Sequence, residues 1–394
     1  APRGRVISAP LDRPQAEHWV DVVPEGSAVI EALTIAGGSL LVSTSEHAVS
    51  HLWRYALDGS GGQEMGLPEP GAIVGIDAEP AVERAFVTFT SFARPPALWR
   101  WEAGESLEPW SHHVSPIDPA RYEVRQVFYE STDGARVPMF LISQPGSSSP
   151  QPAVLTGYGG FAIASTPAFS PGIVAWCDAG GLYALAGIRG GGEYGEEWHE
   201  AGMRHRKQQV FDDFAAAAAW LADQGLTTPE RLAIRGGSNG GLLVGATVTQ
   251  RPDLCKAAVC AVPLLDMLRY DRYLIGALWV PEYGDPADPD DFKTLFAYSP
   301  YHRVVDGFDY PALLILTAES DSRVDPMHAR KFAARMQTAV QGVRATQAGA
   351  DSLILLRVES RAGHGLGKPR WKQADELADT WAFIVWQLGL PNPI

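Results

Sequence analysis

The sequence predicts an α/β protein whose mixed part is preceded by an all-β region. Residues 28–101 consist of short apolar segments separated by turn residues, among them paired glycines and paired prolines, a pattern typical of β-strands. After Pro116, strand-like and helix-like segments alternate, which is the order of an α/β domain. We therefore predict an all-β domain over 1–115 and an α/β domain over 116–394, because domains of roughly 150 residues are common.

Two stretches of the all-β region, 29–57 and 71–101, repeat a similar spacing of strand-like segments. Consecutive blades of a propeller would show this spacing, and a β-sandwich explains it equally well. Two blades cannot close a propeller ring, so a propeller here would be partial. The expected strands cover residues 29–35, 39–45, 50–57, 71–76, 84–89 and 97–101.

The apolar pattern of the α/β region predicts a largely parallel sheet covered by helices. Residues 312–316 are apolar throughout, as in strands that are buried on both faces. The clearest helix contains the alanine-rich run 215–220. We predict strands over 124–129, 137–142, 153–156, 182–188, 232–235, 258–261, 313–317 and 353–358, and helices over 212–224, 240–250, 327–340 and 373–388.

The composition excludes several classes of protein. Hydrophobic residues make up 46% and charged residues 20% of the chain, which argues against a disordered protein or a coiled coil. The net charge of −14 opposes binding to nucleic acid or to an anionic membrane surface. No segment approaches the roughly 20 consecutive apolar residues of a membrane helix. Basic or neutral peptides suit this chain better as ligands.

The cysteines Cys177, Cys255 and Cys260 are too few for a disulfide framework and form no Cys-x-x-Cys pair. We expect them to be buried free thiols. The first six residues lack the apolar core of a signal peptide. A cytoplasmic location is expected, and a periplasmic or secreted location stays open because we expect the natural N-terminus to lie upstream.

Residues 236–240 read Gly-Gly-Ser-Asn-Gly and fit the Gly-x-Ser-x-Gly pattern of a nucleophile elbow. An apolar strand precedes this segment and a helix follows it, which is the context that the elbow requires. The turn between strand and helix is so sharp that side chains beside the serine would collide. We therefore predict Ser238 as a catalytic nucleophile.

A serine hydroxyl needs a histidine to take its proton and a carboxylate to orient that histidine. In α/β-hydrolases the carboxylate and then the histidine follow the serine in the chain. His302, His328 and His364 lie beyond Ser238. His302 precedes the last suitable carboxylate loop, and His328 is expected on the surface of a helix. His364 lies in a glycine-rich loop after the strand 353–358 and is the predicted base.

The carboxylate should follow the C-terminal end of a neighbouring strand, where the sites of open α/β sheets gather. Glu319, Asp321 and Asp325 all follow the strand 313–317. Asp325 precedes Pro326 and resembles a helix N-cap, and Glu319 lies very close to the end of the strand. We therefore select Asp321.

Several motifs of the chain resemble, in the same order, those of the prolyl oligopeptidase family of serine peptidases, over about 124–394. This resemblance implies an α/β-hydrolase domain joined to a seven-bladed propeller, and it favours a propeller over a sandwich for 1–115. It also implies that the chain enters partway through the propeller and is the C-terminal part of a longer polypeptide, or works with a separate N-terminal piece. The matching motifs are Gly-Tyr-Gly-Gly-Phe at 157–161, Arg-Gly-Gly-Gly-Glu-Tyr-Gly-Glu at 189–196, Gly-Gly-Ser-Asn-Gly-Gly-Leu-Leu at 236–243, Trp279 with Tyr283-Gly284, Asp-Ser-Arg-Val at 321–324 and Ala-Gly-His-Gly at 362–365.

The resemblance also implies roles for individual residues. Ser238, Asp321 and His364 match the catalytic triad of the family, in agreement with the reasoning above. Trp279 matches the indole that stacks on the substrate's proline ring, although core packing is the simpler interpretation from the residue alone. The remaining matches are Tyr158 and the Asn239 backbone N–H in the oxyanion hole, Phe161, Tyr283, Val324 and Asn239 lining the proline pocket, and Arg323 binding a substrate carbonyl.

The predicted function is that of a serine endopeptidase that cleaves short peptides on the carboxyl side of proline through an acyl-enzyme, with no metal or organic cofactor implied. An oligopeptidase specific for basic residues, an acylaminoacyl peptidase and an esterase are alternatives on the same fold. A catalytically inactive peptide-binding protein would be expected to lack part of the triad or the oxyanion tyrosine. Residues 190–195 also fit the Gly-x-Gly-x-x-Gly pattern of a dinucleotide site, but the acidic residues that follow oppose a phosphate.

Overall fold

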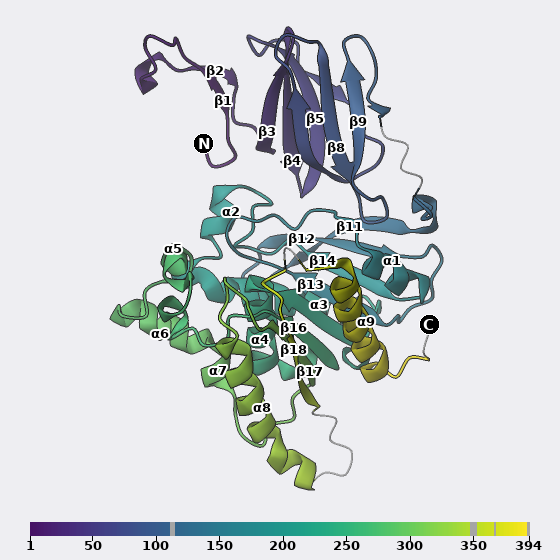
Figure 1. Cartoon of the computed structure of the whole chain (residues 1–394), viewed down its shortest axis with the longest axis vertical. Helices are drawn as coiled ribbons and strands as arrows, with labels where there is room; N and C mark the ends of the chain where they lie inside the picture. Colours follow the sequence, from purple (N-terminus) through teal and green to yellow (C-terminus); the bar gives the residue numbers. More distant parts are fainter. Residues whose placement is uncertain (111–114, 347–352, 366–367, 392–394) are drawn as a thin grey trace. The chain divides into compact units, whose positions relative to one another are not determined.

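The computed structural model describes residues 1–110, 115–346, 353–365 and 368–391 (Figure 1). These residues form two compact units. The first unit takes in two short segments from the middle of the chain, so the division is not a single cut in the sequence. It comprises Ala1–Arg121, Ala164–Val174 and Gly192–Trp198, and the second comprises Tyr122–Ile163, Ala175–Gly191 and His199–Ile394.

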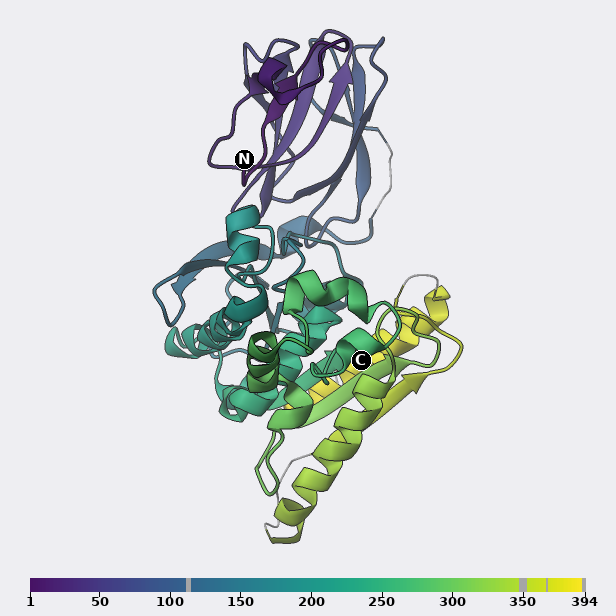
Figure 2. The ribbon, with the colours of Figure 1, turned by 90° about the vertical axis from the view of Figure 1, so that its left-hand side faces the viewer.

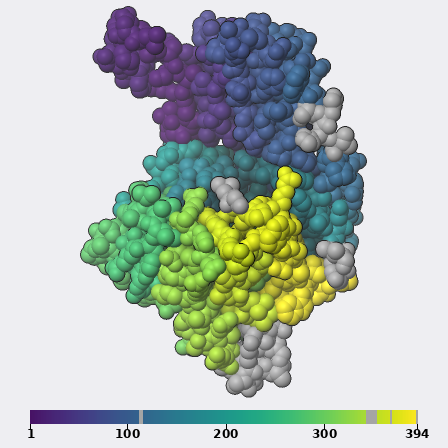
Figure 3. Space-filling model, in the orientation of Figure 1, coloured from purple at the N-terminus to yellow at the C-terminus, as the bar shows by residue number. Residues whose placement is uncertain are grey.

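Within the described residues, the first unit holds two four-stranded antiparallel sheets and one strand pair. Each four-stranded sheet joins strands in chain order, the arrangement of a propeller blade. The loop between the paired strands protrudes from the rest of the unit (Figure 3). The pair is β1 (Val6–Ser8) and β2 (Val20–Val23), one sheet is β3 (Val29–Ala36), β4 (Ser39–Glu46), β5 (Val49–Ala56) and β6 (Gln63–Met65), and the other is β7 (Ala72–Ala78), β8 (Arg84–Thr90), β9 (Ala97–Glu102) and β10 (Glu108–Pro109).

The two blade-like sheets are packed through an apolar cluster. Ala36 and Leu41 come from one sheet, and Ala85 and Trp101 come from the other. All four are at most 2% exposed. Alternation of side chains along each strand places these residues on one face, so the period-two pattern of the sequence produces the contact between the sheets.

The second unit contains one eight-stranded sheet in the described part of the chain, in the order β11-β12-β14-β13-β15-β16-β17-β18. The strands from β14 to β18 pair in parallel, and β11 and β12 are antiparallel at one edge. Every residue of β17 is buried, as its apolar sequence predicts. The strands are β11 (Glu123–Glu130), β12 (Arg136–Ser143), β13 (Ala153–Gly157), β14 (Leu182–Ala186), β15 (Leu232–Gly237), β16 (Ala257–Ala261), β17 (Ala312–Ala318) and β18 (Ile354–Glu359).

Helices cover both faces of this sheet, and Figure 2 shows α8 and α9 on opposite faces. Trp176 of α1 stacks on Trp381 of α9 at a centroid distance of 5.3 Å, so these two helices share a face. The helix α4 packs on β15 and β16. The helices are α1 (Pro171–Asp178), α2 (Glu196–Glu200), α3 (Lys207–Asp223), α4 (Asn239–Gln250), α5 (Val280–Tyr283), α6 (Pro289–Tyr298), α7 (Pro300–Arg303), α8 (Met327–Thr346) and α9 (Arg370–Gln387).

Cys177, Cys255 and Cys260 are buried and free, which confirms the expectation for the thiols. In the described ranges, no helix combines the length and the apolar character needed to cross a membrane.

The expectation of a surface position for His328 was wrong. His328 is 2% exposed, and its Nδ1 accepts hydrogen bonds from the backbone N–H groups of Leu265 at 3.3 Å and Asp266 at 3.1 Å. The first turn of α8 packs on this segment, whose buried N–H groups need an acceptor. Burial lowers the pKa of His328 to about 4, against the opposing charges of Asp266 and Asp325.

We expect His328 to make the protein less stable as the pH falls. Its pKa is about 4 in the folded state and 6.5 when unperturbed, so the unfolded chain binds more protons between these values and the free energy of unfolding decreases. His328→Asn keeps an acceptor but cannot titrate, and it should remove about 2 kcal/mol of the loss between pH 7 and pH 5. Urea unfolding at the two pH values measures this difference. The same pH dependence in variant and parent would contradict the prediction.

Candidate active site

Ser238 is the single residue between β15 and α4. Its backbone has φ 57° and ψ −118°, a conformation that residues with a Cβ rarely adopt. Its N–H donates to the carbonyl of Ala261 at 2.9 Å, and its carbonyl accepts from the N–H of Gly241 at 2.9 Å. These contacts hold the strained turn of a nucleophile elbow.

Glycines are required for this turn to close. A Cβ at Gly236 would lie 2.1 Å from the carbonyl oxygen of Gly240, and a Cβ at Gly240 would lie 2.9 Å from the carbonyl oxygen of Gly157. Both distances are shorter than real contacts allow. The pattern around Ser238 therefore has a steric cause in this chain.

His364 and Asp321 meet at the carboxyl edge of the same parallel sheet. His364 Nδ1 lies 2.7 Å from Asp321 Oδ2, and the Asp321 side chain is completely buried. The other oxygen, Oδ1, accepts from the backbone N–H groups of Arg323 and Val324, each at 2.9 Å. The carboxylate is thus fixed in position, and a proton on His364 Nδ1 leaves Nε2 available as a base.

Asp325 and Glu319 were the other candidates for the carboxylate that orients His364, and the structure places both of them differently. The Asp325 carboxylate accepts from the N–H of Met327 at 2.8 Å, which agrees with its expected place at the start of α8. Glu319 follows β17 by one residue and is exposed. Asp321 is the carboxylate that the structure brings to His364.

Tyr158 follows β13, which pairs in parallel with β15, and its hydroxyl lies near enough to the Ser238 hydroxyl to affect the pKa of Tyr158. Burial raises the pKa of Tyr158, and the hydrogen bond to Ser238 and the charge of Arg323 offset part of this shift. The hydroxyl therefore keeps its proton near neutral pH and can act as a donor. The N–H of Asn239 lies in the first turn of α4, where backbone donors have no acceptor within the helix.

The Asn239 side chain connects this tyrosine to a second one. Asn239 Nδ2 donates to the carbonyl of Tyr158, and Asn239 Oδ1 accepts from the hydroxyl of Tyr283 at 2.8 Å. Asn239 is 2% exposed. One amide thus joins the candidate oxyanion hole to the candidate proline pocket.

The aromatic residues predicted for the pocket come from two separate segments. Phe161 meets the ring of Tyr283 edge-on, at a centroid distance of 5.6 Å. Trp279 lies in the turn that leads into α5 and is only half-buried, so its ring is not simply part of the core. Val324 is buried, and Arg323 is exposed beside Asp321.

The glycine-rich segment after β14 supports the Tyr158 loop. The N–H of Ala162 donates to the carbonyl of Gly190 at 3.2 Å, and a Cβ at Gly190 would lie 2.6 Å from the carbonyl oxygen of Gly159. The Arg189 guanidinium is held by the carboxylates of Asp213 and Asp133. The segment ends in the five-residue helix α2, which opens with two glutamates and opposes a phosphate. The dinucleotide interpretation therefore finds no support.

Sequence reasoning missed a buried group of charged residues next to these loops. Lys207 is completely buried, and Glu282 is 4% exposed. Glu282 lies between Trp279 and Tyr283 in the sequence, a segment that was selected for its aromatic residues alone. A lysine and a glutamate 75 residues apart give no periodic signal, so the pairing could not be found without the fold.

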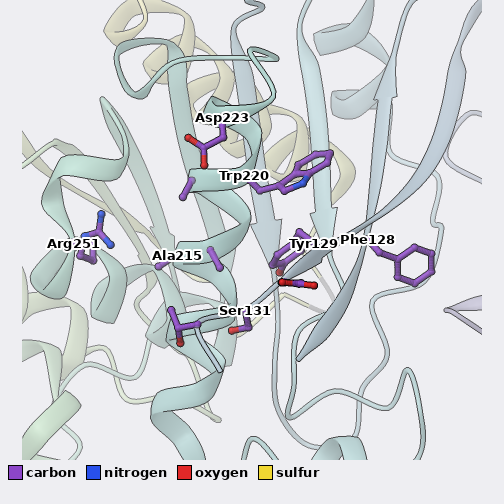
Figure 4. Close-up of a pocket in the computed structure, with 11 residues that line it drawn as sticks. Phe128, Tyr129, Ser131, Ala215, Trp220, Asp223 and Arg251 are labelled. Carbon is purple, nitrogen blue, oxygen red and sulfur yellow. The ribbon is translucent and has the colours of Figure 1, made fainter. Parts of the chain in front are cut away.

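A surface hollow of about 520 Å³ in the second unit lies away from this site (Figure 4). It is formed by β11, the residues after β11, and α3, together with Arg251. None of the candidate catalytic or pocket residues lines it. Figure 4 shows Trp220 and Tyr129 among the residues at its wall.

Two family models match the chain. The model of the prolyl oligopeptidase family matches residues 167–391, and that of the prolyl oligopeptidase N-terminal β-propeller domain matches residues 1–111. The second match favours the propeller over the sandwich, and together the matches confirm the predicted α/β-hydrolase fold with an N-terminal propeller region.

Relatives and solved structures agree with these matches. Prolyl endopeptidase of Elizabethkingia miricola is 37% identical over 100% of this chain and 55% of its own length, and that of Dictyostelium discoideum is 36% identical over 98% and 52%. A structure from a study of two prolyl endopeptidases has a TM-score of 0.93 and 43% identity over 99% of this chain and 57% of its own. Prolyl oligopeptidase B of Galerina marginata, bound to a 35mer hydrolysis and macrocyclization substrate, has a TM-score of 0.90 and 32% identity, covering 99% and 55%.

This chain spans little more than half the length of these relatives, at 55% for the first of them. These matches cover 99–100% of this chain, so they include both the blades and the hydrolase sheet. Because a family model covers residues 167–391 and a relative at 37% identity aligns along the whole chain, the chain belongs to the prolyl oligopeptidase family.

Proposed function

We propose that this chain carries the catalytic machinery of a serine endopeptidase that hydrolyses peptide bonds on the carboxyl side of proline in short peptides. The observation that supports this most is the strained Ser238, with Tyr158 beside it, on the same sheet edge as the His364–Asp321 pair. The names of the relatives, which are prolyl endopeptidases and prolyl oligopeptidases, support the choice of proline.

The geometry suits acyl transfer. Ser238 Oγ attacks the carbonyl carbon of the scissile bond while His364 Nε2 takes the hydroxyl proton, and Asp321 stabilises the resulting imidazolium. The oxyanion of the tetrahedral intermediate accepts hydrogen bonds from the Tyr158 hydroxyl and the Asn239 N–H. When the C–N bond breaks, His364 gives its proton to the leaving amine. Water then hydrolyses the acyl-enzyme by the same steps and restores Ser238.

The charge of the pocket favours proline over a basic side chain. A basic substrate residue would need a carboxylate in the pocket. Glu282 precedes Tyr283, but its side chain is buried and already engaged by Lys207 and His199. An inactive binding protein is disfavoured because the triad residues and the oxyanion tyrosine are all present.

Replacing Trp279 by alanine should reduce kcat/KM more for proline peptides than for alanine peptides, because only proline presents a ring for stacking. Aromatic contacts of this kind are worth roughly 0.5–1.5 kcal/mol beyond burial, so the additional loss should be about two- to tenfold. Chromogenic peptides that differ only in this residue measure the effect. Trp386→Ala, at a Trp that is 62% exposed, serves as the control. Equal losses of kcat/KM for both peptides would show that Trp279 supports the structure and does not recognise the proline ring.

A further inference from the structure

We propose that Lys207, Glu282 and His199 are positioning residues that hold the Tyr158 loop, residues 158–162, against the segment that carries Tyr283. The three form a network in which Lys207 and Glu282 are buried and His199 is partly buried. This network touches no reacting atom and acts through Tyr158. This inference rests on the proposed function of Tyr158 as an oxyanion donor.

Lys207 contacts the loop directly. It is the first residue of α3, and its Nζ donates to the carbonyl oxygen of Gly159 at 2.8 Å. The same nitrogen lies 3.4 Å from Glu282 Oε1 and 5.3 Å from the centre of the Tyr283 ring. One ammonium group therefore meets the loop, the carboxylate and the pocket tyrosine at once.

Glu282 contacts the loop from a second side. The backbone N–H of Phe161 is near the Glu282 carboxylate and contributes to lowering its pKa, and Glu282 Oε2 lies 2.7 Å from His199 Nε2. Gly159 and Phe161 flank Gly160, so Lys207 and Glu282 approach the loop on both sides of Gly160. Glu282 also directly precedes Tyr283 in the chain, so the network is connected to the segment that carries the pocket tyrosine.

The loop needs such support because its backbone is strained. Gly159, Phe161 and Ala162 have φ values of 63°, 58° and 53°, and two of these residues carry a Cβ that disfavours this region. Strained conformations persist where the surroundings fix them from several directions. A catalytic donor displaced by about 1 Å can lose on the order of a hundredfold in rate, so the strain makes the position of the Tyr158 hydroxyl depend on these contacts.

Lys207 and Glu282 each oppose the effect of burial on the pKa of the other. Burial lowers the pKa of Lys207, and the charge of Glu282 opposes this shift. Burial acts to raise the pKa of Glu282, but the hydrogen bond from His199 and the charge of Lys207 outweigh it and leave that pKa below its ordinary value. Removal of one partner therefore leaves the other group buried without its counter-charge.

Lys207→Met is the first test, since it removes the ammonium and keeps most of the length of the side chain. We expect kcat for proline and alanine peptides to fall alike, by about ten- to a hundredfold, because a misplaced oxyanion donor affects the transition state of both. Lys293→Met, at an exposed lysine, is the matched control and should behave as the parent. An unchanged kcat in a folded Lys207→Met variant would overturn the proposal.

A double-mutant cycle with Tyr158→Phe separates positioning from general destabilisation. If the network acts through the Tyr158 hydroxyl, Lys207→Met should lower kcat less than threefold when that hydroxyl is already absent. Losses that multiply would overturn the proposal. The pair Lys207→Met with Glu282→Met removes both charges and should recover thermal stability while kcat stays low. Recovery of kcat together with stability would also contradict positioning.

The rate at which a fluorophosphonate labels Ser238 provides a readout that does not depend on proline specificity. This reaction also develops charge on an oxygen in the oxyanion hole, so Lys207→Met should slow it by a similar factor. If the parent protein reacts with the probe but does not cleave after proline, the proposed specificity fails while the positioning role is still measured. Equal labelling rates in parent and variant would overturn the positioning role itself.

Discussion

Ser238→Ala should abolish turnover of every peptide substrate, with a loss on the order of 10⁶-fold in kcat. The hydroxyl is the group that forms the acyl-enzyme, and the chain offers no substitute at the tip of the elbow. Alanine keeps the Cβ, so the backbone conformation at φ 57° is no more strained than with serine. The fold and the melting temperature should therefore be preserved.

Steady-state kinetics and fluorophosphonate labelling measured by mass spectrometry test this expectation. The variant should bind a proline peptide yet neither cleave it nor take up the probe. Ser148→Ala, at an exposed loop serine, should keep full activity. Turnover within tenfold of the parent would show that another residue is the nucleophile.

Tyr158→Phe should lower kcat by roughly 10²–10³-fold, the loss of about 2.7–4 kcal/mol that removal of one oxyanion donor typically causes. The Asn239 N–H remains, so activity should fall without disappearing. KM should change little because the hydroxyl matters most when negative charge develops on the substrate oxygen. The loop keeps its backbone contact with Asn239 Nδ2, which preserves the fold.

The comparison of kcat and KM for the same proline peptide measures this effect. Tyr273→Phe, at a tyrosine that is 39% exposed, is the matched control. A change confined to KM, or a loss of kcat below threefold, would mean that Tyr158 only lines the pocket.

Local patterns explain why much of the fold could be predicted. The elbow at Ser238 depends on glycines within a few residues, and β17 is apolar along its whole length because both of its faces are buried. The choice of His364 and Asp321 needed only their order in the chain and their places after strands. Short strands such as β1, β6 and β10, with two or three residues each, lack enough residues to show alternation and were not predicted.

Long-range contacts explain what the sequence could not show. His328 was expected on a helix surface, because its burial depends on backbone N–H groups more than 60 residues away in the chain. Lys207 and His199 are ordinary polar residues in the sequence, and their meeting with Glu282 depends on how distant loops pack. Buried charges of this kind are paired by the tertiary structure, and the sequence shows no periodic pattern that would reveal the pairs.

The double role of Asn239 has a consequence for protein engineering. Its amide holds the carbonyl of Tyr158 with one atom and the hydroxyl of Tyr283 with the other. A library that widens the pocket by replacing Tyr283 also releases this amide, so clones with a new substrate preference should emerge with reduced rates. Selection for both traits would then favour second changes at or beside position 239, and randomising positions 239 and 283 together is the more productive design.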